Sequence, residues 1–148
     1  FEEVAGLIHA AGLDCRRRTA RGGPIRDVLL LDTIGELWSF YALCDIAFVG
    51  GSLVKVGGHN LLEPAAMKKP VIFSSYMFNF KEISEALIQA GGGIMVKDKD
   101  ELYDKLDNLL NDKELAGSIG EKAFKVIASN SGATARTIDA VHGLIIGK

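Results

Sequence analysis

The sequence predicts an α/β protein built on a doubly wound parallel sheet. Short apolar runs alternate along the chain with segments of helical periodicity, which is the order that a parallel sheet with helices on both faces requires. One run, residues 28–31, is continuously apolar and is typical of a strand covered on both faces. No repeat, low-complexity tract or internal linker interrupts the pattern, so we expect one domain over residues 1–148.

The first half of the chain contains two helix signals and three strand signals. Apolar residues recur at helical spacing from Val4 to Ala11, and Gly12 is placed to end that helix. Thr33 and Glu36 have the spacing of a capping box, which predicts that the next helix begins there. The expected elements are a helix over 4–11, a strand over 13–18, a turn over 22–24, a strand over 28–31, a helix over 33–44 and a strand over 46–49.

The second half alternates helices with strands and then becomes helical. Residues 91–93 are all glycine and are expected to turn the chain from a helix into a strand. Asp98 or Asp100, and Asp112, are suited to cap the helices that follow them. The expected elements are a helix over 61–67, a strand over 71–73, a helix over 80–90, a strand over 94–96 and a helical C-terminal segment over about 98–148, with helices over 100–111, 112–129 and 134–146.

Composition and charge narrow the class of protein. The 148 residues are 48% hydrophobic, carry a formal net charge of −2 and have a pI near 5.9, which is typical of a globular domain and gives no support for nucleic-acid binding. Arginines at 16, 17, 18 and 21 lie in a turn-rich stretch. They predict a solvated surface or, as the alternative, a contact with an anionic or membrane surface.

Further features bear on location. No apolar run approaches the ~18 residues that a membrane span needs, and the start of the chain has neither the basic residues nor the apolar core of a signal peptide. Cys15 and Cys44 lack CxxC spacing and lie in apolar surroundings, and we expect both to be buried thiols in a reducing compartment, which predicts a cytoplasmic protein. The chain begins at Phe1 in a helical pattern without an initiator methionine, so we expect it to be a fragment.

A glycine-rich loop joins the strand at 46–49 to the next helix. Its glycines, Gly50, Gly51, Gly57 and Gly58, favour a backbone that turns sharply or approaches another group closely. A strand, a glycine-rich loop and a helix N-terminus in succession form an arrangement that receives phosphate. The loop at 74–79 also follows a strand directly, so both loops are expected to share a cleft at the carboxyl edge of the sheet.

Four side chains of the glycine-rich loop have chemistry suited to an anion. Ser52 is expected to present its hydroxyl, and His59 or Lys55 to supply charge. Asn60 stands where a helix N-cap belongs, so the first N–H groups of the helix are expected to point toward the ligand.

Structural interpretations of the same residues remain open. Asn60 and Glu63 have the spacing of a capping box, whereas a carboxylate at Glu63 beside a phosphate site can also accept both hydroxyls of a ribose. His59 is either a hydrogen-bonded loop histidine or a phosphate contact, and Lys55 is more often solvated. Asn79 either closes its loop or contacts the nucleotide.

Known catalytic motifs are absent from the sequence. The glycine-rich loop contains neither GxxxxGK[ST] nor GxGxxG, and the chain has no GxSxG nucleophile elbow and no metal-ligand cluster. These residues therefore predict a nucleotide or phosphosugar site without an evident catalytic base, metal or cofactor.

Several segments together resemble a known family. The pattern is similar to the C-terminal half of the 3-deoxy-D-manno-octulosonic acid (Kdo) transferases, and the similarity runs through nearly the whole chain. The segments that carry it are Asp32-Thr33-Ile34-Gly35-Glu36-Leu37, Gly50-Gly51-Ser52, Gly57-Gly58-His59-Asn60, Glu63-Pro64-Ala65-Ala66, Lys69-Pro70-Val71 and Phe78-Asn79-Phe80.

The resemblance implies a GT-B glycosyltransferase, in which two Rossmann-like domains face each other. Such enzymes transfer Kdo from CMP-Kdo to a lipid A precursor at the cytoplasmic face of the inner membrane, without a bound metal. The C-terminal half holds the donor, so residues 1–148 would be a nucleotide-sugar-binding domain. The N-terminal domain, absent from this chain, would supply the general base, the lipid A precursor site and the membrane contact.

Carried over to this sequence, the resemblance assigns donor-binding roles and no catalytic residue. Glu63 would bind the ribose, and Asn79 is a weaker candidate for a donor contact. The residues that would line the phosphate side are Gly50, Gly51, Ser52, Gly57, Gly58, His59 and Asn60. The chain departs from the family at residues 74–75, where Ser-Ser replaces the usual Gly-Pro and puts the shape of that loop in doubt.

Other interpretations fit less of the sequence. The C-terminal domain of another GT-B enzyme, such as a UDP-sugar transferase or epimerase, has the same succession of strand, glycine loop, helix and glutamate. A receiver-like signalling domain needs a cluster of aspartates at strand ends, and this chain offers Asp32 without an acidic pair. A purely structural domain leaves the loop glycines unexplained.

Overall fold

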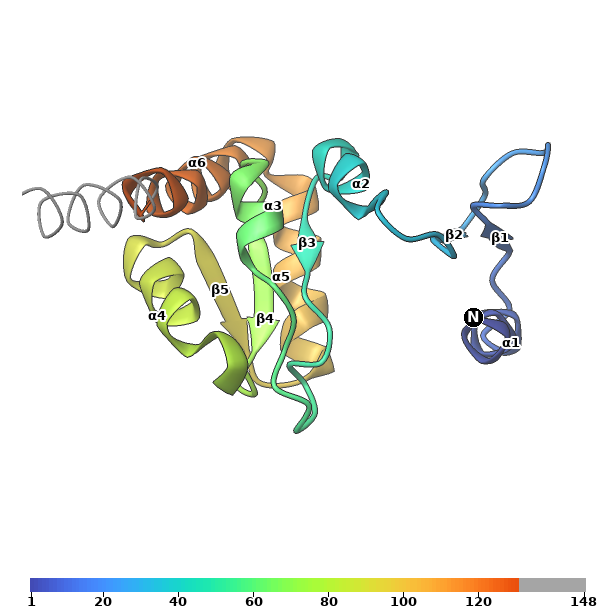
Figure 1. Cartoon of the computed structure of the whole chain (residues 1–148), viewed down its shortest axis with the longest axis horizontal. Helices are drawn as coiled ribbons and strands as arrows, with labels where there is room; N and C mark the ends of the chain where they lie inside the picture. Colours follow the sequence, from blue (N-terminus) through green and yellow to red (C-terminus); the bar gives the residue numbers. More distant parts are fainter. Residues whose placement is uncertain (131–148) are drawn as a thin grey trace, which may run out of the picture. The chain divides into compact units, whose positions relative to one another are not determined.

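The computed structural model describes residues 1–130, which belong to two compact units. The first unit comprises Phe1–Phe40 and the second begins at Tyr41, so the boundary falls within helix α2 (Leu37–Leu43). The first unit contains α1 (Glu2–Ala10), β1 (Cys15–Arg17) and β2 (Val28–Leu30) (Figure 1).

The first unit is a small parallel β-α assembly. Strands β1 and β2 pair in parallel from Cys15 opposite Val28 to Arg17 opposite Leu30. The turn expected between them is confirmed, since Gly22 and Gly23 both adopt positive φ angles, of 73° and 81°. No side chain in the first unit is fully buried, and all three residues of β2 are half-buried. Within the first unit, the expectation that β2 is covered on both faces is therefore not met, because no side chain of β2 is fully buried there. Strand β2 pairs with β1 alone among the described strands.

Helix α2 begins later than the sequence predicted. The expected capping box at Thr33 does not form; instead the Thr33 hydroxyl donates to the Glu36 side chain at 2.5 Å, and the helix starts at Leu37. Arg18 pairs with the same carboxylate at 3.0 Å, so Glu36 bonds to two side chains and not to the backbone at a helix end.

The second unit contains a three-stranded parallel sheet in the order β3-β4-β5. The strands are β3 (Ala47–Phe48), β4 (Val71–Ser74) and β5 (Gly93–Val96), with Val71 opposite both Ala47 and Gly93. The segments between and after them are α3 (Leu62–Ala66), the 3-10 turn η1 (Phe78–Phe80), α4 (Lys81–Ala90), α5 (Lys99–Asn111) and α6 (Lys113–Asn130). The predicted α/β class with parallel strands is confirmed, although the described strands form two sheets and not one.

Helices cover both faces of this second sheet (Figure 1). Val71 and Phe73 of β4 point to one face, where they pack with Leu87 of α4 and Ala123 of α6. Ile72 points to the other face, and its core cluster comprises Ile72, Val96, Leu109 and Ala116. Alternate residues of one strand thus serve two cores, which is the arrangement of a strand buried on both sides.

Helix α6 approaches the rest of the second unit at two glycines. A Cβ at Gly120 would overlap the backbone carbonyl of Lys68, and a Cβ at Gly92 would overlap the backbone of Ala123. Lys68 has a φ of 56°, and its ammonium group pairs with Glu121 of α6 at 2.8 Å. Gly92 was expected only as part of a turn, whereas its position also requires the close approach of a helix.

Several predicted helix ends are confirmed. The Asp98 carboxylate accepts hydrogen bonds from the N–H groups of Asp100 and Glu101, and Asp112 accepts one from Leu115. Gly91 ends α4 in the left-handed region at φ 68°. The helix expected over 134–146 lies outside the described residues. Within residues 1–130, no helix is long and apolar enough to cross a membrane.

Candidate functional site

The glycine-rich loop after β3 and the loop after β4 are joined by backbone hydrogen bonds. The N–H of Tyr76 donates to the carbonyl of Ser52 at 3.1 Å, and the N–H of Asn79 donates to the carbonyl of Gly57 at 3.3 Å. Both loops therefore lie together at the carboxyl end of the β3-β4-β5 sheet, where open α/β sheets bind their ligands.

Three of the loop glycines are required by the loop itself. Gly57 and Gly58 adopt φ angles of 105° and 75°, and a Cβ on either would overlap the second loop, at Asn79 and Met77 respectively. Gly51 has a φ of 71°, and its Cβ would stand 3.3 Å from the His59 ring. The close approach that the glycines indicated is thus an approach between two parts of the chain.

Gly50 differs from the other three glycines. It is exposed, its φ is not positive, and no atom lies within 4 Å of the position that its Cβ would occupy. Neither the conformation nor the packing of the described chain requires glycine here.

Ser52, by contrast, is turned inward. Its side chain is fully buried, and its hydroxyl donates to the carbonyl of Val49 at 2.7 Å. The prediction that Ser52 presents its hydroxyl to an anion is therefore wrong. Ser52 holds the start of the glycine-rich loop against the end of β3, while Lys55 and His59 are exposed on the same loop.

Asn60 and Glu63 are linked through their side chains. The Oδ1 atom of Asn60 accepts a hydrogen bond from the N–H of Leu62 at 2.9 Å, and its Nδ2 donates to Oε1 of Glu63 at 3.2 Å. The N-cap position of α3 is occupied by Leu61 and not by Asn60. The prediction that Asn60 is the N-cap is therefore wrong by one residue. The reciprocal backbone bonds of a capping box do not form, and α3 is five residues long.

Tyr41 is a neighbour of Glu63 that the sequence did not identify. Burial raises the pKa of the half-buried Tyr41 hydroxyl, and the negative charge of Glu63 raises it further. No local spacing in the sequence connects Tyr41 with Glu63. Cys44 lies just after the end of α2, and not within the helix as expected. Cys15 and Cys44 are both half-buried, and not buried as expected, and burial raises the pKa of the Cys44 thiol.

Ser74, the first of the two residues that depart from the family pattern, belongs to strand β4. Strand β4 continues through Ser74, whose buried hydroxyl donates to the carbonyl of Val96 in β5 at 2.6 Å. Ser75 follows as an exposed residue. The serine therefore ties together the carboxyl ends of two strands at the point where the second loop begins.

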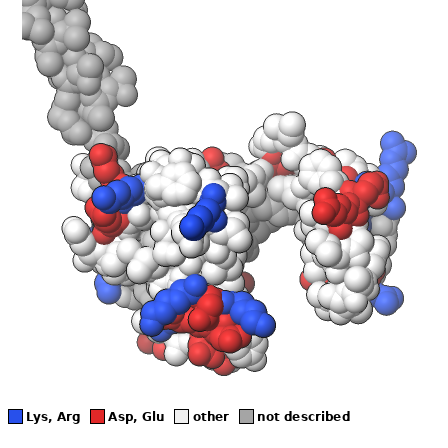
Figure 2. Space-filling model, turned by 90° about the horizontal axis from the view of Figure 1, so that it is seen from below, with Lys and Arg blue, Asp and Glu red and all other residues white. Residues whose placement is uncertain are grey.

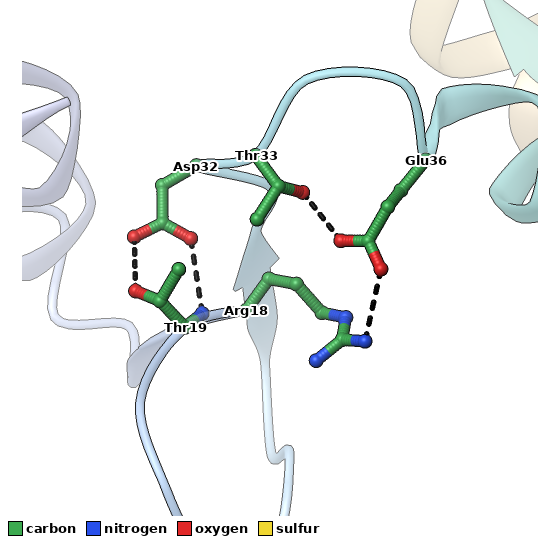
Figure 3. Close-up of polar contacts among 5 residues, drawn as sticks. All are labelled: Arg18, Thr19, Asp32, Thr33 and Glu36. Carbon is green, nitrogen blue, oxygen red and sulfur yellow. Dashed lines mark hydrogen bonds and ion pairs between the residues drawn. The ribbon is translucent and has the colours of Figure 1, made fainter.

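A separate polar cluster lies in the first unit, at the carboxyl ends of β1 and β2 (Figure 3). Asp32 accepts hydrogen bonds from the N–H and the hydroxyl of Thr19, at 3.0 and 2.6 Å. Glu36 accepts from Arg18 at one oxygen and from Thr33 at the other. All four carboxylate oxygens of Asp32 and Glu36 are bonded, so the cluster joins the segment that follows β2 to the residues that follow β1.

Three consecutive arginines of the first unit form contacts within the chain. Arg17 pairs with Glu2 at 2.6 Å, Arg18 with Glu36, and Arg16 donates to the carbonyls of Ala20 and Gly23. Their positions favour local structural roles over the alternative of an open anionic or membrane contact.

Charged side chains elsewhere are mixed in sign. Figure 2 shows acidic and basic side chains side by side on the face that it draws. Helix α5 itself carries both signs, since Asp100, Asp104 and Lys105 are all exposed on it. Within the described part of the chain, no group of three or more His, Cys, Asp or Glu side chains is arranged to hold a metal ion.

The fold and the two loops agree with a known class of enzyme. The sequence profile of the family described as Glycosyl transferases group 1 matches residues 23–142. The chain therefore belongs to the group 1 glycosyl transferases.

Particular members of this class show which branch is most similar. The chain is 40% identical over 145 residues to the 3-deoxy-D-manno-octulosonic acid transferase of Bordetella pertussis, covering 96% of the chain and 34% of that protein. It is 42% identical over 142 residues to the enzyme of the same name from Haemophilus influenzae, covering 94% of the chain and 33% of that protein. The chain thus spans about a third of the length of these curated relatives.

Comparison with solved structures also indicates similarity to a Kdo transferase. The crystal structure of the C-terminal CMP-Kdo binding domain of WaaA from Acinetobacter baumannii matches with a TM-score of 0.79 at 33% identity, over 85% of this chain and 67% of that one. The resemblance to the C-terminal half of the Kdo transferases is confirmed, and a UDP-sugar enzyme is not favoured.

Proposed function

We propose that this chain is the donor-binding half of a glycosyltransferase that transfers Kdo from CMP-Kdo to a lipid A precursor. The observation that carries the proposal is the match, over most of the chain, to a solved CMP-Kdo binding domain. The two joined loops at the carboxyl end of β3 and β4 support it, because that edge is where such domains hold nucleotides.

The donor loops are suited to stabilising the leaving nucleotide. When the bond between the sugar and the phosphate oxygen breaks, its electron pair remains on CMP, and the phosphate gains negative charge. Fixed backbone N–H groups at Gly50 and Gly51, together with His59, would oppose that charge as preorganised dipoles. Glu63 would accept the ribose hydroxyls, and Asn79, exposed on the second loop, would contact the donor.

The remaining predicted residues act through the shape of the loop. Gly57 and Gly58 allow the two loops to meet, and Ser52 anchors the first of them to β3. We place the group that removes the proton from the acceptor hydroxyl in the part of the relatives that this chain does not cover. The lipid A precursor and the cytoplasmic face of the inner membrane would likewise be contacted through that part, and no cofactor is involved.

Nucleotide binding tests the assignment directly. Isothermal titration of the 148-residue chain with CMP and with UMP is expected to show weak binding that favours CMP. A preference for UMP would contradict the Kdo assignment and support a UDP-sugar enzyme instead. The chain alone is expected to transfer no Kdo from CMP-Kdo to a lipid acceptor, and measurable transfer would place the general base within it.

A further inference from the structure

We propose that Asn60 is a positioning residue that orients the carboxylate of Glu63 and thereby sets the discrimination between ribo- and deoxyribonucleotides. This inference rests on the proposed nucleotide-binding function and assigns to Asn60 a role different from the phosphate contact that its position suggested. It follows from the two hydrogen bonds that join the Asn60 side chain to Leu62 and to Glu63.

Both ends of the Asn60 amide are used within the chain. The N–H of Leu62 donates to Oδ1 at 2.9 Å, which fixes the orientation of the amide, since an N–H cannot donate to the NH₂ end. The Nδ2 end is then directed to Oε1 of Glu63, at 3.2 Å. Asn60 therefore has its hydrogen-bonding groups committed to the turn and to Glu63.

The backbone of Glu63 lies between buried residues, and one oxygen of its carboxylate is hydrogen-bonded. Its neighbours Leu61, Pro64 and Ala65 are all fully buried or nearly so, so the start of α3 cannot shift easily. Oε1 is bonded to Asn60, whereas Oε2 has no hydrogen-bond partner among residues 1–130. Tyr41 lies close enough to Glu63 for the charge of the carboxylate to raise the pKa of the Tyr41 hydroxyl.

This arrangement presents one carboxylate in one orientation to an incoming diol. Hydrogen bonds from ribose hydroxyls to a carboxylate are charge-assisted and depend on alignment. If Asn60 did not hold Oε1, the Glu63 side chain would lose rotamer freedom on binding, and part of the gain from the 2′-hydroxyl would be offset. The quantity that Asn60 controls is therefore the ratio of the affinities for CMP and 2′-deoxy-CMP.

Two variants separate this role from a purely structural one. Asn60→Asp and Asn60→Ser both keep an oxygen that can accept from the N–H of Leu62, so the turn is retained. The ionised side chain of Asn60→Asp has no donor to offer Glu63. The side chain of Asn60→Ser ends one bond short of the position of Nδ2, and its oxygen is used to accept from the N–H of Leu62. Each is compared with the unaltered chain, with Glu63→Ala, and with the double variants that combine Glu63→Ala with either change.

The measurement is the dissociation constant of each protein for CMP and for 2′-deoxy-CMP, by titration calorimetry or NMR. The unaltered chain is expected to prefer CMP by about tenfold, as one charge-assisted hydrogen bond allows. Asn60→Ser and Asn60→Asp are expected to reduce this ratio to about twofold or less, as Glu63→Ala does. In the Glu63→Ala background, either change at Asn60 is expected to leave the ratio unaltered, because the two residues act as one unit.

Each other outcome identifies a different failure. If the Asn60 variants keep the preference for CMP, or lose affinity for both nucleotides equally, Asn60 does not act through Glu63 and the inference is wrong while nucleotide binding stands. If the unaltered chain binds neither nucleotide, the proposed function of the chain itself fails, and the inference fails with it.

Discussion

Strand β2 and the first three residues of strand β4 are both apolar runs in parallel sheets, yet they are buried to very different extents. Val71, Ile72 and Phe73 of β4 are at most 1% exposed, whereas every residue of β2 is only half-buried. Strand β4 pairs on both edges and has helices on both faces, while β2 pairs with β1 alone among the described strands. The burial of a strand therefore depends on the elements that surround it, and an apolar sequence shows only that the strand is suited to burial.

The polar contacts of the two units differ in the same way. The second unit closes its core with buried hydroxyls such as those of Ser52 and Ser74, each bonded to a backbone carbonyl. The first unit has instead the partly exposed cluster of Asp32, Glu36 and Arg18. We expect the second unit to depend on packing, and the first to depend more on hydrogen bonds and charge.

Matched leucine truncations give the largest expected contrast. Leu87→Ala removes a side chain with no exposed surface from the larger core of the second unit and is expected to cost about 3 kcal/mol of unfolding free energy. Leu30→Ala removes a half-buried side chain from β2 and is expected to cost about 1 kcal/mol. Urea denaturation followed by circular dichroism measures both, and equal losses would show that the two units are equally well packed.

Two glycines of α6 test how closely this helix approaches its neighbours. Gly120→Ala forces a Cβ against the carbonyl of Lys68, and is expected to lower the unfolding free energy by about 2 kcal/mol. Gly117→Ala, in the same helix with no atom near the new Cβ, is expected to raise it by about 0.5 kcal/mol, since alanine favours the helix. If both variants were stabilised, the close contact between α6 and Lys68 would be wrong.

The loop glycines distinguish a structural role from a binding role. Gly57→Ala is strained at φ 105° and overlaps Asn79, so we expect it to lower the unfolding free energy by about 1–2 kcal/mol and to weaken CMP binding. Gly50→Ala meets no atom of the chain and is expected to leave stability within about 0.5 kcal/mol while still weakening CMP binding. Unchanged CMP affinity in Gly50→Ala would remove Gly50 from the nucleotide site.

Local patterns in the sequence identified most elements of this fold. Helical periodicity, the aspartate caps at Asp98 and Asp112, and the glycine that ends α4 depend on neighbours a few residues away, and all were confirmed. The late start of α2 could not be predicted, because Glu36 is drawn to Arg18, a residue distant in the sequence.

The candidate site shows the same limit. Its loops could be found from their glycines and from their position after strands, and their meeting is confirmed by two backbone hydrogen bonds. The inward hydroxyl of Ser52, the Asn60–Glu63 bond and the approach of Tyr41 depend on side-chain directions and on tertiary neighbours. These features decide which predicted residues can touch a ligand and which support the others.

Lowering the pH is expected to give the smallest and most local effect, at the hydrogen bonds between Asp32 and Thr19 in the first unit. The hydrogen bond from the Thr19 hydroxyl lowers the pKa of Asp32, so the ionised carboxylate is favoured in the folded state. A group whose pKa is lowered by folding contributes stability above its unfolded pKa and loses that contribution as the pH falls through its folded pKa. We expect the NMR signal of the Thr19 amide to change with a midpoint below the ordinary aspartate pKa, and Asp32→Asn to abolish that titration. A midpoint at or above the ordinary value would mean that the bonds from Thr19 do not favour the charged carboxylate, and that the first unit does not depend on these hydrogen bonds and charges more than the second unit does.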